Sequence, residues 1–410
     1  MRVLVLSDVY FPRVNGVSTS IATFRADLVA TGVETTLVVP EYDDGVDADE
    51  ATDIIRIPSG RVPGDPEDRR MQWGSLNRAL LTLRARRFDL VHVQTPFLAH
   101  YAGVRFARAE GLPVIETYHT FFEEYLHHYV PLLPRPLGRR LARTLTRSQC
   151  AQVDAIVAPS QPMSDMLEAI GVRKPVQVIP TGLPAERFAT GDGARFRKQQ
   201  GLPTDRPLLL YVGRVAHEKN IGFLIESFLE IRRARPDAML VIAGEGPARA
   251  ALSARVEHLG LSRDIAFVGY LDRERSLADC YAAAAVFVFA SRTETQGLVL
   301  LEAMAQACAV VSTAYLGTAS ILQPGCGARV APEEPVAFAQ AVIDLLDDPA
   351  RRLLRGTQAQ AYARGWASRL MAWRMREFYA ELCGRAKISP GAATPAAPGE
   401  PDERQTCLDS

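Results

Sequence analysis

The sequence predicts an α/β protein built from two Rossmann-like domains that face each other across a cleft. Short apolar runs rich in β-branched residues alternate with helix-like segments, which is the pattern of a parallel sheet covered on both faces. The alternation occurs twice, and a stretch with two prolines and a glycine at residues 179–184 separates the two sets as a hinge. A length of 410 residues suits two domains of roughly 150–200 residues each.

The predicted elements follow in order along the chain. The first set of strands covers residues 2–7, 35–39, 54–57, 89–93, 113–117, 154–158 and 176–179. A loop at residues 8–20 follows the first strand, and the first helix is predicted over residues 21–30. The second set of strands covers residues 207–212, 239–243, 265–268, 285–289 and 308–312.

The end of the chain divides into two parts. Residues 363–386 carry apolar and aromatic side chains at helical spacing, which predicts an amphipathic helix. Residues 387–410 are rich in Pro, Ala and Gly and have little apolar bulk, so we expect a disordered tail.

Composition excludes several classes of function. Lys+Arg and Asp+Glu both total 47, so no global field steers the chain onto nucleic acid. The six cysteines are scattered without a C-x-x-C pair, which argues against a disulfide framework or a structural zinc site and indicates a reducing cytosol. No apolar stretch approaches the ~18 residues of a membrane span, and the apolar start is too short for a signal peptide. We therefore expect a cytoplasmic protein.

The strongest chemical signal lies at residues 291–305, where a strand ends, a polar turn follows and a helix begins near Gly297 or Leu298. Unpaired backbone N–H groups and the helix dipole favour an anion at such a helix start, and glycine lets a diphosphate approach the main chain. Glu294 precedes the helix and is placed to reach sugar hydroxyls. Glu302 lies inside the helix, where its carboxylate can accept hydrogen bonds from two ribose hydroxyls. The alternative for two glutamates is solvated surface charge, which this strand–turn–helix context disfavours.

A second cluster follows the first strand of the second domain. Arg214 and Lys219 come after the strand at 207–212, at the edge where open α/β sheets bind ligands. Arginine offers a planar fork and lysine a mobile charge, and together they can offset a leaving diphosphate. Two surface cations are the alternative, but the dipole of the helix that follows disfavours cations at this position.

Two segments carry a resemblance to the retaining GT-B glycosyltransferases of family four: Gly213-Arg214 with Lys219-Asn220, and Glu294-x7-Glu302 followed by Ala-Met-Ala. The resemblance covers nearly the whole folded chain. It implies an acceptor-binding domain at residues 1–182, a nucleotide-sugar-binding domain at 183–362 and a helix at 363–386 that packs back toward the first domain. Catalysis in the family is metal-independent and retains the anomeric configuration, so no metal or cofactor is implied beyond the nucleotide-sugar donor.

The resemblance also implies individual roles. Arg214 and Lys219 hold the donor diphosphate, Glu294 contacts the donor sugar and Glu302 holds the ribose. The backbone of Gly297, Leu298 and Val299 binds phosphate. The family usually has Gly and Pro just after Glu-Ala-Met-Ala, whereas Ala307 and Ala309 stand there in this chain; this departure alters a turn and leaves the charged groups in place.

The first domain supplies two further candidates, both by resemblance. Asn15-Gly16-Val17 is similar to the family's glycine loop, which places Gly16 near the donor phosphates. His119 follows the strand at 113–117 and matches a cleft histidine that contacts the donor sugar near its reacting carbon; a satisfied loop histidine is the alternative. His92 lies inside a predicted strand and is interpreted as structural.

Two other patterns are set aside. The Asp-x-Asp at residues 47–49 imitates a metal motif of another glycosyltransferase architecture, but it lies in an acidic loop and is interpreted as solvated surface. Gly244-Glu245-Gly246 follows a strand but lacks the third glycine of a dinucleotide fingerprint, so NAD binding is not expected.

The acceptor side is indicated by residues 134–147. Leu137, Leu141 and Leu145 recur every four residues beside a run of arginines that comprises Arg135, Arg139, Arg140, Arg143 and Arg147. Such a helix has an apolar stripe beside a cationic one, as interfacial helices do; the alternative is a helix packed on the domain with its arginines in water. The preceding segment 118–129 resembles the acceptor region of bacterial diacylglycerol glucosyltransferases and lipid mannosyltransferases.

Four hypotheses for function follow. The first is a retaining transferase that moves a hexose from UDP-glucose or GDP-mannose to a membrane lipid such as diacylglycerol or a phospholipid-type glycolipid, acting peripherally at the inner face of the cytoplasmic membrane. The second uses a polysaccharide or polyprenyl-linked acceptor. A nucleotide-sugar 2-epimerase shares the architecture but transfers nothing, and a non-catalytic binding module is disfavoured by the complete set of site residues.

Overall fold

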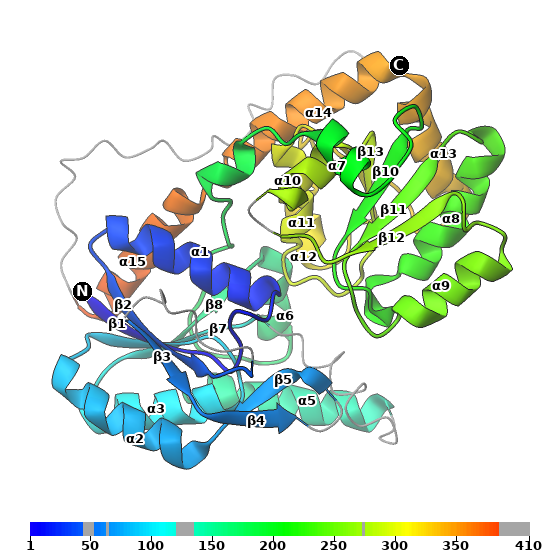
Figure 1. The fold of residues 1–410 in the computed structure, drawn as a ribbon. Helices are drawn as coiled ribbons and strands as arrows, with labels where there is room; N and C mark the ends of the chain where they lie inside the picture. The colour runs from blue at the N-terminus through cyan, green and yellow to red at the C-terminus, as the bar shows by residue number, and fades with distance from the viewer. Residues whose placement is uncertain (44–52, 63–64, 120–134, 273–274, 385–410) are drawn as a thin grey trace.

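A computed structural model describes residues 1–43, 53–62, 65–119, 135–272 and 275–384. Two parallel sheets form the frame of the molecule (Figure 1). The seven-stranded N-terminal sheet has the order β3 (Ile54–Ile57), β2 (Glu34–Pro40), β1 (Arg2–Leu6), β6 (Leu90–Val93), β7 (Val114–Thr117), β8 (Ala155–Ala158) and β9 (Val176–Val178). The six-stranded C-terminal sheet has the order β12 (Ile265–Gly269), β11 (Met239–Ala243), β10 (Leu208–Val212), β13 (Val286–Phe289), β14 (Ala309–Ser312) and β15 (Arg329–Val330).

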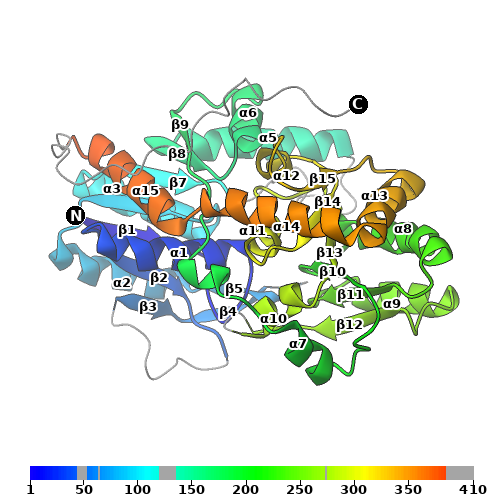
Figure 2. The same ribbon diagram turned by 90° about the horizontal axis from the view of Figure 1, so that it is seen from above.

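Helices flank both sheets (Figures 1 and 2). Those of the N-terminal half are α1 (Gly16–Ala30), α2 (Trp73–Leu83), α3 (Leu98–Glu110), α5 (Arg135–Cys150) and α6 (Gln161–Ala169). Those after the hinge are α7 (Gly193–Gln199), α8 (Ile221–Ala234), α9 (Arg249–His258), α10 (Ser276–Ala282), α11 (Leu298–Ala305), α12 (Gly317–Ile321), α13 (Pro335–Asp347), α14 (Pro349–Arg364) and α15 (Ser368–Leu382). A small antiparallel hairpin, β4 (Ser59–Val62) with β5 (Asp65–Met71), lies outside the two main sheets.

Alternating side chains of the N-terminal strands divide between two hydrophobic clusters. In β1, Leu4 and Leu6 belong to one cluster and Val3 and Val5 to the other, because successive side chains of a strand point to opposite faces. The second cluster also contains Met371 and other residues of α15, so the C-terminal helix covers this sheet beside α1 (Figure 1). Both faces of the sheet are therefore buried, as its apolar strands require.

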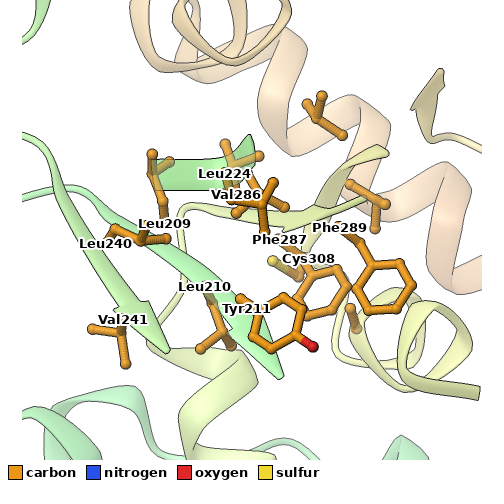
Figure 3. Close-up of a cluster of buried hydrophobic side chains, with 14 of the residues drawn as sticks. Leu209, Leu210, Tyr211, Leu224, Leu240, Val241, Val286, Phe287, Phe289 and Cys308 are labelled. Atoms are coloured by element: carbon orange, nitrogen blue, oxygen red, sulfur yellow. The ribbon is translucent and has the colours of Figure 1, made fainter. Parts of the chain in front are cut away.

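The C-terminal sheet has a core with stacked aromatic rings at its centre (Figure 3). Tyr211 of β10 stacks on Phe289 of β13 with ring centroids 5.8 Å apart and planes 13° apart. Phe287 and Phe289 are 6.0 Å apart with an interplanar angle of 18°. This packing holds together the carboxyl ends of β10 and β13, after which the loops with Arg214 and Glu294 begin.

Three local expectations were wrong. Helix α1 begins at Gly16 instead of residue 21, because Asn15 caps it: its Oδ1 accepts a hydrogen bond from the Ser18 N–H at 2.8 Å. The helix expected over 363–386 is broken, since α14 ends at Arg364 and α15 starts at Ser368. The hairpin β4–β5 and the short strand β15 were not predicted.

The break before α15 has a structural cause. Leu183 of the hinge donates its N–H to the Trp366 carbonyl at 2.7 Å and accepts from the Ser368 N–H at 2.9 Å. A Cβ on Gly182 would lie 2.4 Å from the Ser368 Cα, so only glycine permits this approach. The hinge and the returning chain thus pair backbone to backbone. The tail expected at 387–410 and the acidic 47–49 motif lie outside the described residues.

Candidate active site

The loop between β13 and α11 brings two predicted residues together. Glu294 lies in this loop, and its Oε1 accepts a hydrogen bond from the Lys219 Nζ at 2.7 Å. The two side chains are 20% and 19% exposed, so the ion pair is partly shielded from water. Lys219 follows β10 through the short turn at His217–Lys219, and the neighbouring strand β13 places Glu294 beside it. Two residues 75 positions apart in the sequence thus form an ion pair at the carboxyl edge of the C-terminal sheet.

Gly297 ends this loop in the left-handed conformation, with φ 96° and ψ 48°, as the N-cap of α11. A Cβ at this position would come 3.0 Å from the Thr318 Cγ2. Leu298 and Val299 form the first turn of α11, whose backbone N–H groups have no acceptor within the helix. The helix start predicted near Gly297 or Leu298 is confirmed, and it provides the local geometry that suits an anion.

Glu302 lies on α11 with only 4% of its surface exposed. Its Oε2 accepts a hydrogen bond from the Tyr281 hydroxyl at 3.1 Å. Tyr281 belongs to α10 and is itself buried, so it fixes the carboxylate in one orientation. This tyrosine was not among the predicted site residues; a buried tyrosine on a separate helix gives no sequence signal for its partner.

The Arg214 loop is fixed by close backbone contacts. The Tyr211 hydroxyl donates to the Arg214 carbonyl at 3.2 Å. A Cβ on Gly244 would lie 2.0 Å from the Gly213 carbonyl oxygen, and one on Gly246 would lie 2.4 Å from the Val215 carbonyl oxygen. The two glycines after β11 therefore let this loop pack against the one that carries Arg214, which accounts for the incomplete dinucleotide fingerprint.

A carboxylate missed by sequence reasoning organises the same edge. Glu333 accepts from Asn220 Nδ2 at 2.9 Å and from Arg292 Nε at 2.8 Å. The Arg292 hydrogen bond is the main reason why the pKa of Glu333 lies below its usual value of 4.5. Asn220 also donates to the Ala290 carbonyl at 3.3 Å, so this network joins the two loops that supply Lys219 and Glu294.

In the N-terminal half, Gly16 starts α1 at the carboxyl edge of the sheet. Its environment is open, since a Cβ built on it would meet nothing within 4 Å. The backbone of this turn is therefore accessible, with the helix capped by Asn15 just before it.

His119 follows β7 and pairs with a residue of the adjacent strand end. Its Nε2 lies 2.9 Å from the Gln94 Oε1. Burial lowers the pKa of His119 to about 4, so the imidazole is neutral at pH 7. Gln94 was not predicted, although it follows the strand β6 as His119 follows β7.

His92 is held inside the domain by two partners. Its Nδ1 lies 2.7 Å from the Tyr379 hydroxyl and its Nε2 lies 2.7 Å from the Thr117 Oγ1. Burial, and after it the nearby His119, lowers the pKa of His92 to about 3. These contacts agree with the structural interpretation, because they join α15 to the sheet.

Helix α5 carries an unusual surface. The leucines predicted as its apolar stripe face outward: Leu137 is 54% exposed, Leu141 52% and Leu145 37%. Residues on its buried side are small or polar, namely Ala142, Thr146, Gln149 and Cys150. The helix packs on the domain through this face and leaves both the leucines and the arginines at the surface, an arrangement that agrees with an interfacial helix and with a helix whose arginines lie in water.

The arginines of α5 border a groove between α5 and the end of α6. Its volume is about 650 Å³, and it is lined by Pro136, Arg139, Arg140, Arg143, Arg147, Ala169 and Ile170. The backbone of Arg135 starts the helix. Of the resembling segment 118–129, only the first two residues lie in the described part of the chain.

Two negative observations complete the description. Within the described ranges, no helix is both long and apolar enough to cross a membrane. The His, Cys, Asp and Glu side chains of the same ranges form no group of three or more that is placed to hold a metal ion.

Two parallel α/β sheets with charged loops at their carboxyl edges define a GT-B architecture, the class to which fold and site point. Family comparison agrees: residues 14–187 match "Glycosyltransferase Family 4" and residues 192–363 match "Glycosyl transferases group 1". The chain belongs to glycosyltransferase family 4 and is a glycosyltransferase.

Individual relatives are consistent with this family. The chain is 32% identical over 319 residues to the alpha-monoglucosyldiacylglycerol synthase of Streptococcus pneumoniae, covering 76% of this chain and 71% of that one. It is 28% identical over 372 residues to a GDP-mannose-dependent alpha-(1-6)-phosphatidylinositol dimannoside mannosyltransferase of Mycobacterium tuberculosis, covering 89% and 93%.

Solved structures share the fold. A sucrose-phosphate synthase from Thermosynechococcus elongatus superposes with a TM-score of 0.75 at 21% identity, covering 93% of this chain and 99% of that one. Anabaena HepE in complex with UDP-glucose superposes with a TM-score of 0.74 at 17% identity, covering 93% and 100%. The expected GT-B fold is confirmed.

Proposed function

We propose that this protein transfers a hexose from UDP-glucose or GDP-mannose to a membrane lipid, such as diacylglycerol or a phospholipid-type glycolipid. Two relatives support this class of acceptor by name, since one is a diacylglycerol glucosyltransferase and another a phosphatidylinositol dimannoside mannosyltransferase. The enzyme works peripherally at the inner face of the cytoplasmic membrane. Transfer retains the anomeric configuration and uses no metal ion.

The donor half of the reaction is assigned to the C-terminal loops. Arg214 and Lys219 neutralise the diphosphate as it leaves, which is electrostatic stabilisation of developing charge. Backbone N–H groups at Gly297, Leu298 and Val299 add hydrogen bonds to phosphate.

The sugar and the ribose are assigned to carboxylates. Glu294 binds hydroxyls of the donor sugar, and the hydrogen bond from Lys219 at 2.7 Å orients this carboxylate. Glu302, held by Tyr281, accepts hydrogen bonds from the ribose.

The N-terminal half closes the site from the other side. Gly16 allows the backbone to approach the donor phosphates. His119 lies near the reacting carbon. Because its pKa is about 4, the imidazole is neutral at pH 7 and acts as a hydrogen-bonding group without a charge.

The observation that carries the lipid acceptor is the outward face of α5. Exposed leucines beside four arginines match a helix that lies in a membrane interface. Each arginine near an anionic leaflet contributes about 1 kcal/mol, so three of them account for a change of roughly a hundredfold in partitioning.

Liposome flotation tests this proposal. The variant Arg139→Ser/Arg140→Ser/Arg143→Ser should float roughly a hundredfold less with vesicles that contain phosphatidylglycerol, while donor hydrolysis without acceptor stays unchanged. A matched control replaces three exposed arginines of α2 and α3: Arg78→Ser/Arg105→Ser/Arg108→Ser. Equal flotation of both variants and wild type would refute the membrane role of α5.

Product analysis tests the reaction itself. Wild-type protein incubated with labelled UDP-glucose or GDP-mannose should give a labelled lipid only when diacylglycerol or a phospholipid is present. If the label is transferred to a polyprenyl-linked or soluble glycan without any lipid dependence, the acceptor is a glycan and the enzyme acts in glycan assembly. Conversion of the donor to its 2-epimer without acceptor would show an epimerase.

A further inference from the structure

Helix α11 holds the interdomain linker at both of its ends with a glutamine side chain. The linker is defined here as residues 179–192, between β9 and α7. Gln296 precedes α11 and contacts the linker at Thr181. Gln306 follows α11, donates from Nε2 to the Arg187 and Ala189 carbonyls at 2.6 and 2.8 Å, and accepts from the Gly191 N–H at 3.1 Å.

The Gln296 contact is a two-point pairing with one residue. Its Nε2 donates to the Thr181 carbonyl at 2.7 Å, and its Oε1 accepts from the Thr181 N–H at 2.8 Å. The two residues are 5% and 4% exposed, so both backbone groups are bonded away from water. A carboxamide presents a donor and an acceptor side by side, and the backbone partners fix which end is the nitrogen and which the oxygen.

Thr181 in turn is bonded to the first domain. Its Oγ1 donates to the Ser20 Oγ of α1 at 2.7 Å. Ser20 lies one turn inside the helix that begins at Gly16. Gln296 therefore connects the loop of Glu294 and Gly297 with the linker and, through one more hydrogen bond, with the helix whose start faces the donor.

A second bond joins the donor loop, defined here as residues 290–297 between β13 and α11, directly to the N-terminal domain. The Ser160 Oγ, at the N-cap of α6, donates to the Thr295 carbonyl at 2.6 Å. Thr295 and Gln296 are neighbours, so two consecutive residues of the donor loop are bonded across the domain boundary. On its other side the loop packs closely against the start of α12, since a Cβ on Gly317 would lie 2.2 Å from the Thr295 carbonyl carbon.

We propose that Gln296 is a positioning residue that sets Glu294 and Gly297 in register with the N-terminal half of the site. The inference rests on the proposed function, in which the donor is held by one domain and attacked from the other. Transfer requires groups of both domains to be aligned within a fraction of an ångström, and Gln296 links the loop that holds the sugar to the segment that joins the domains.

This role makes a distinctive kinetic prediction. Nucleotide binding uses Arg214, Lys219, Glu302 and the first turn of α11. All of these lie within the C-terminal domain, and the fully buried Leu300 and Leu301 hold α11 in that domain whichever way the Gln296 side chain points. Loss of the carboxamide should therefore lower kcat while nucleotide affinity is retained. If the residue only stabilised the fold, its replacement would lower the melting temperature, but it would not lower kcat while leaving nucleotide affinity unchanged.

The test compares three variants. Gln296→Met keeps the length of the side chain and removes both bonds, and Gln296→Glu places a carboxylate against the Thr181 carbonyl. Gln306→Met is the matched control, because it removes the same kind of bonds from the same linker at the opposite end of α11. For each variant, UDP and GDP affinity is measured by calorimetry, and kcat and KM are measured with whichever of UDP-glucose and GDP-mannose the wild type turns over.

We expect Gln296→Met and Gln296→Glu to lower kcat at least tenfold with nucleotide Kd within twofold of wild type, and Gln306→Met to leave kcat within twofold. Equal loss of kcat in Gln306→Met, or kcat within twofold in Gln296→Met, would overturn the proposal. If neither Gln296 variant folds, Ser160→Ala takes their place, and a kcat within twofold of wild type then counts against the proposal.

Hydrogen exchange supplies a readout that does not depend on transfer, so failure of the proposed function remains distinguishable. Deuterium uptake over residues 290–297 and 181–183 should rise together in Gln296→Met. In Gln306→Met, uptake should rise only near residues 187–191. If uptake over 290–297 is the same in Gln296→Met and wild type, the linker does not position the donor loop.

Discussion

Replacement of Lys219 by Ala is the most direct test of the donor site. Lys219 is bonded to Glu294 at 2.7 Å, and the lysine side chain is only 19% exposed. In the proposed site, the substitution removes one positive charge from the diphosphate, and it leaves the Glu294 carboxylate without this cation. We therefore expect donor binding and turnover to fall together.

The magnitude follows from the geometry of the pair. Two unit charges 4 Å apart interact by about 4 kcal/mol at the effective dielectric of a protein near its surface. Partial exposure screens this interaction, and in the proposed site Arg214 still contributes its charge to the diphosphate. Loss of one donor to developing charge costs about 2.7–4 kcal/mol in enzymes where it has been measured. The lower end, roughly a hundredfold in kcat/KM, is the expected loss.

The assay is steady-state kinetics with UDP-glucose or GDP-mannose, together with calorimetric titration of UDP and GDP. Lys219→Arg keeps the positive charge but replaces the compact ammonium group by a planar guanidinium group. It should therefore be more active than Lys219→Ala and less active than wild type. Lys198→Ala, which removes an exposed lysine of α7 in the same domain, should leave both quantities unchanged. The reasoning is refuted if Lys219→Ala has kcat/KM and nucleotide Kd within twofold of wild type.

Two further predictions concern backbone and burial. Gly297→Ala places a Cβ on a residue with φ 96° and at 3.0 Å from Thr318, so it should destabilise the protein by about 1–3 kcal/mol in thermal unfolding. Gly16→Ala, with open space around it, should leave the melting temperature unchanged but weaken donor binding. Equal effects of the two variants on stability would contradict the difference in their environments. Asp8 is buried at the start of α3 and bonded to Thr95, and burial raises its pKa from 3.8 to about 6. Because the folded protein then binds a proton that the unfolded chain has released, this group lowers the free energy of unfolding by about 1.4 kcal/mol as the pH rises from 5 to 7.5. Asp8→Asn should abolish that slope relative to wild type in urea titrations at the two pH values, and parallel pH dependence of both proteins would argue against the raised pKa.

Local patterns were sufficient for most of the frame. Strands such as β10 and β13 are continuous apolar runs, because a sheet covered on both faces buries every side chain. The same local reasoning located the start of α11 from the glycine at its N-cap. The predicted start of α1 was too late, although Asn15 is a typical N-cap residue and marks the true start.

Tertiary contacts decided the partners. Glu294 and Lys219 were predicted separately from their loops, but their pairing depends on the adjacency of β10 and β13, which are far apart in sequence. Tyr281 and Gln94 contact site residues from other elements, and Glu333 joins the loops that carry Lys219 and Glu294. Nothing in their own sequence neighbourhoods indicates those contacts. A hydrogen bond across dozens of residues leaves no periodic pattern to detect.

By itself, the sequence of this protein determined the class of fold, because strand and helix patterns depend on residues close together in the chain. Its resemblance to family four indicated the reaction class. Only the tertiary structure decided how α5 is oriented. Periodicity revealed its leucine and arginine stripes, but a helix has several faces, and the domain binds the one that carries Ala142, Thr146 and Gln149. Which face is buried depends on the surface that it meets, and that surface is built from strands and helices elsewhere in the chain.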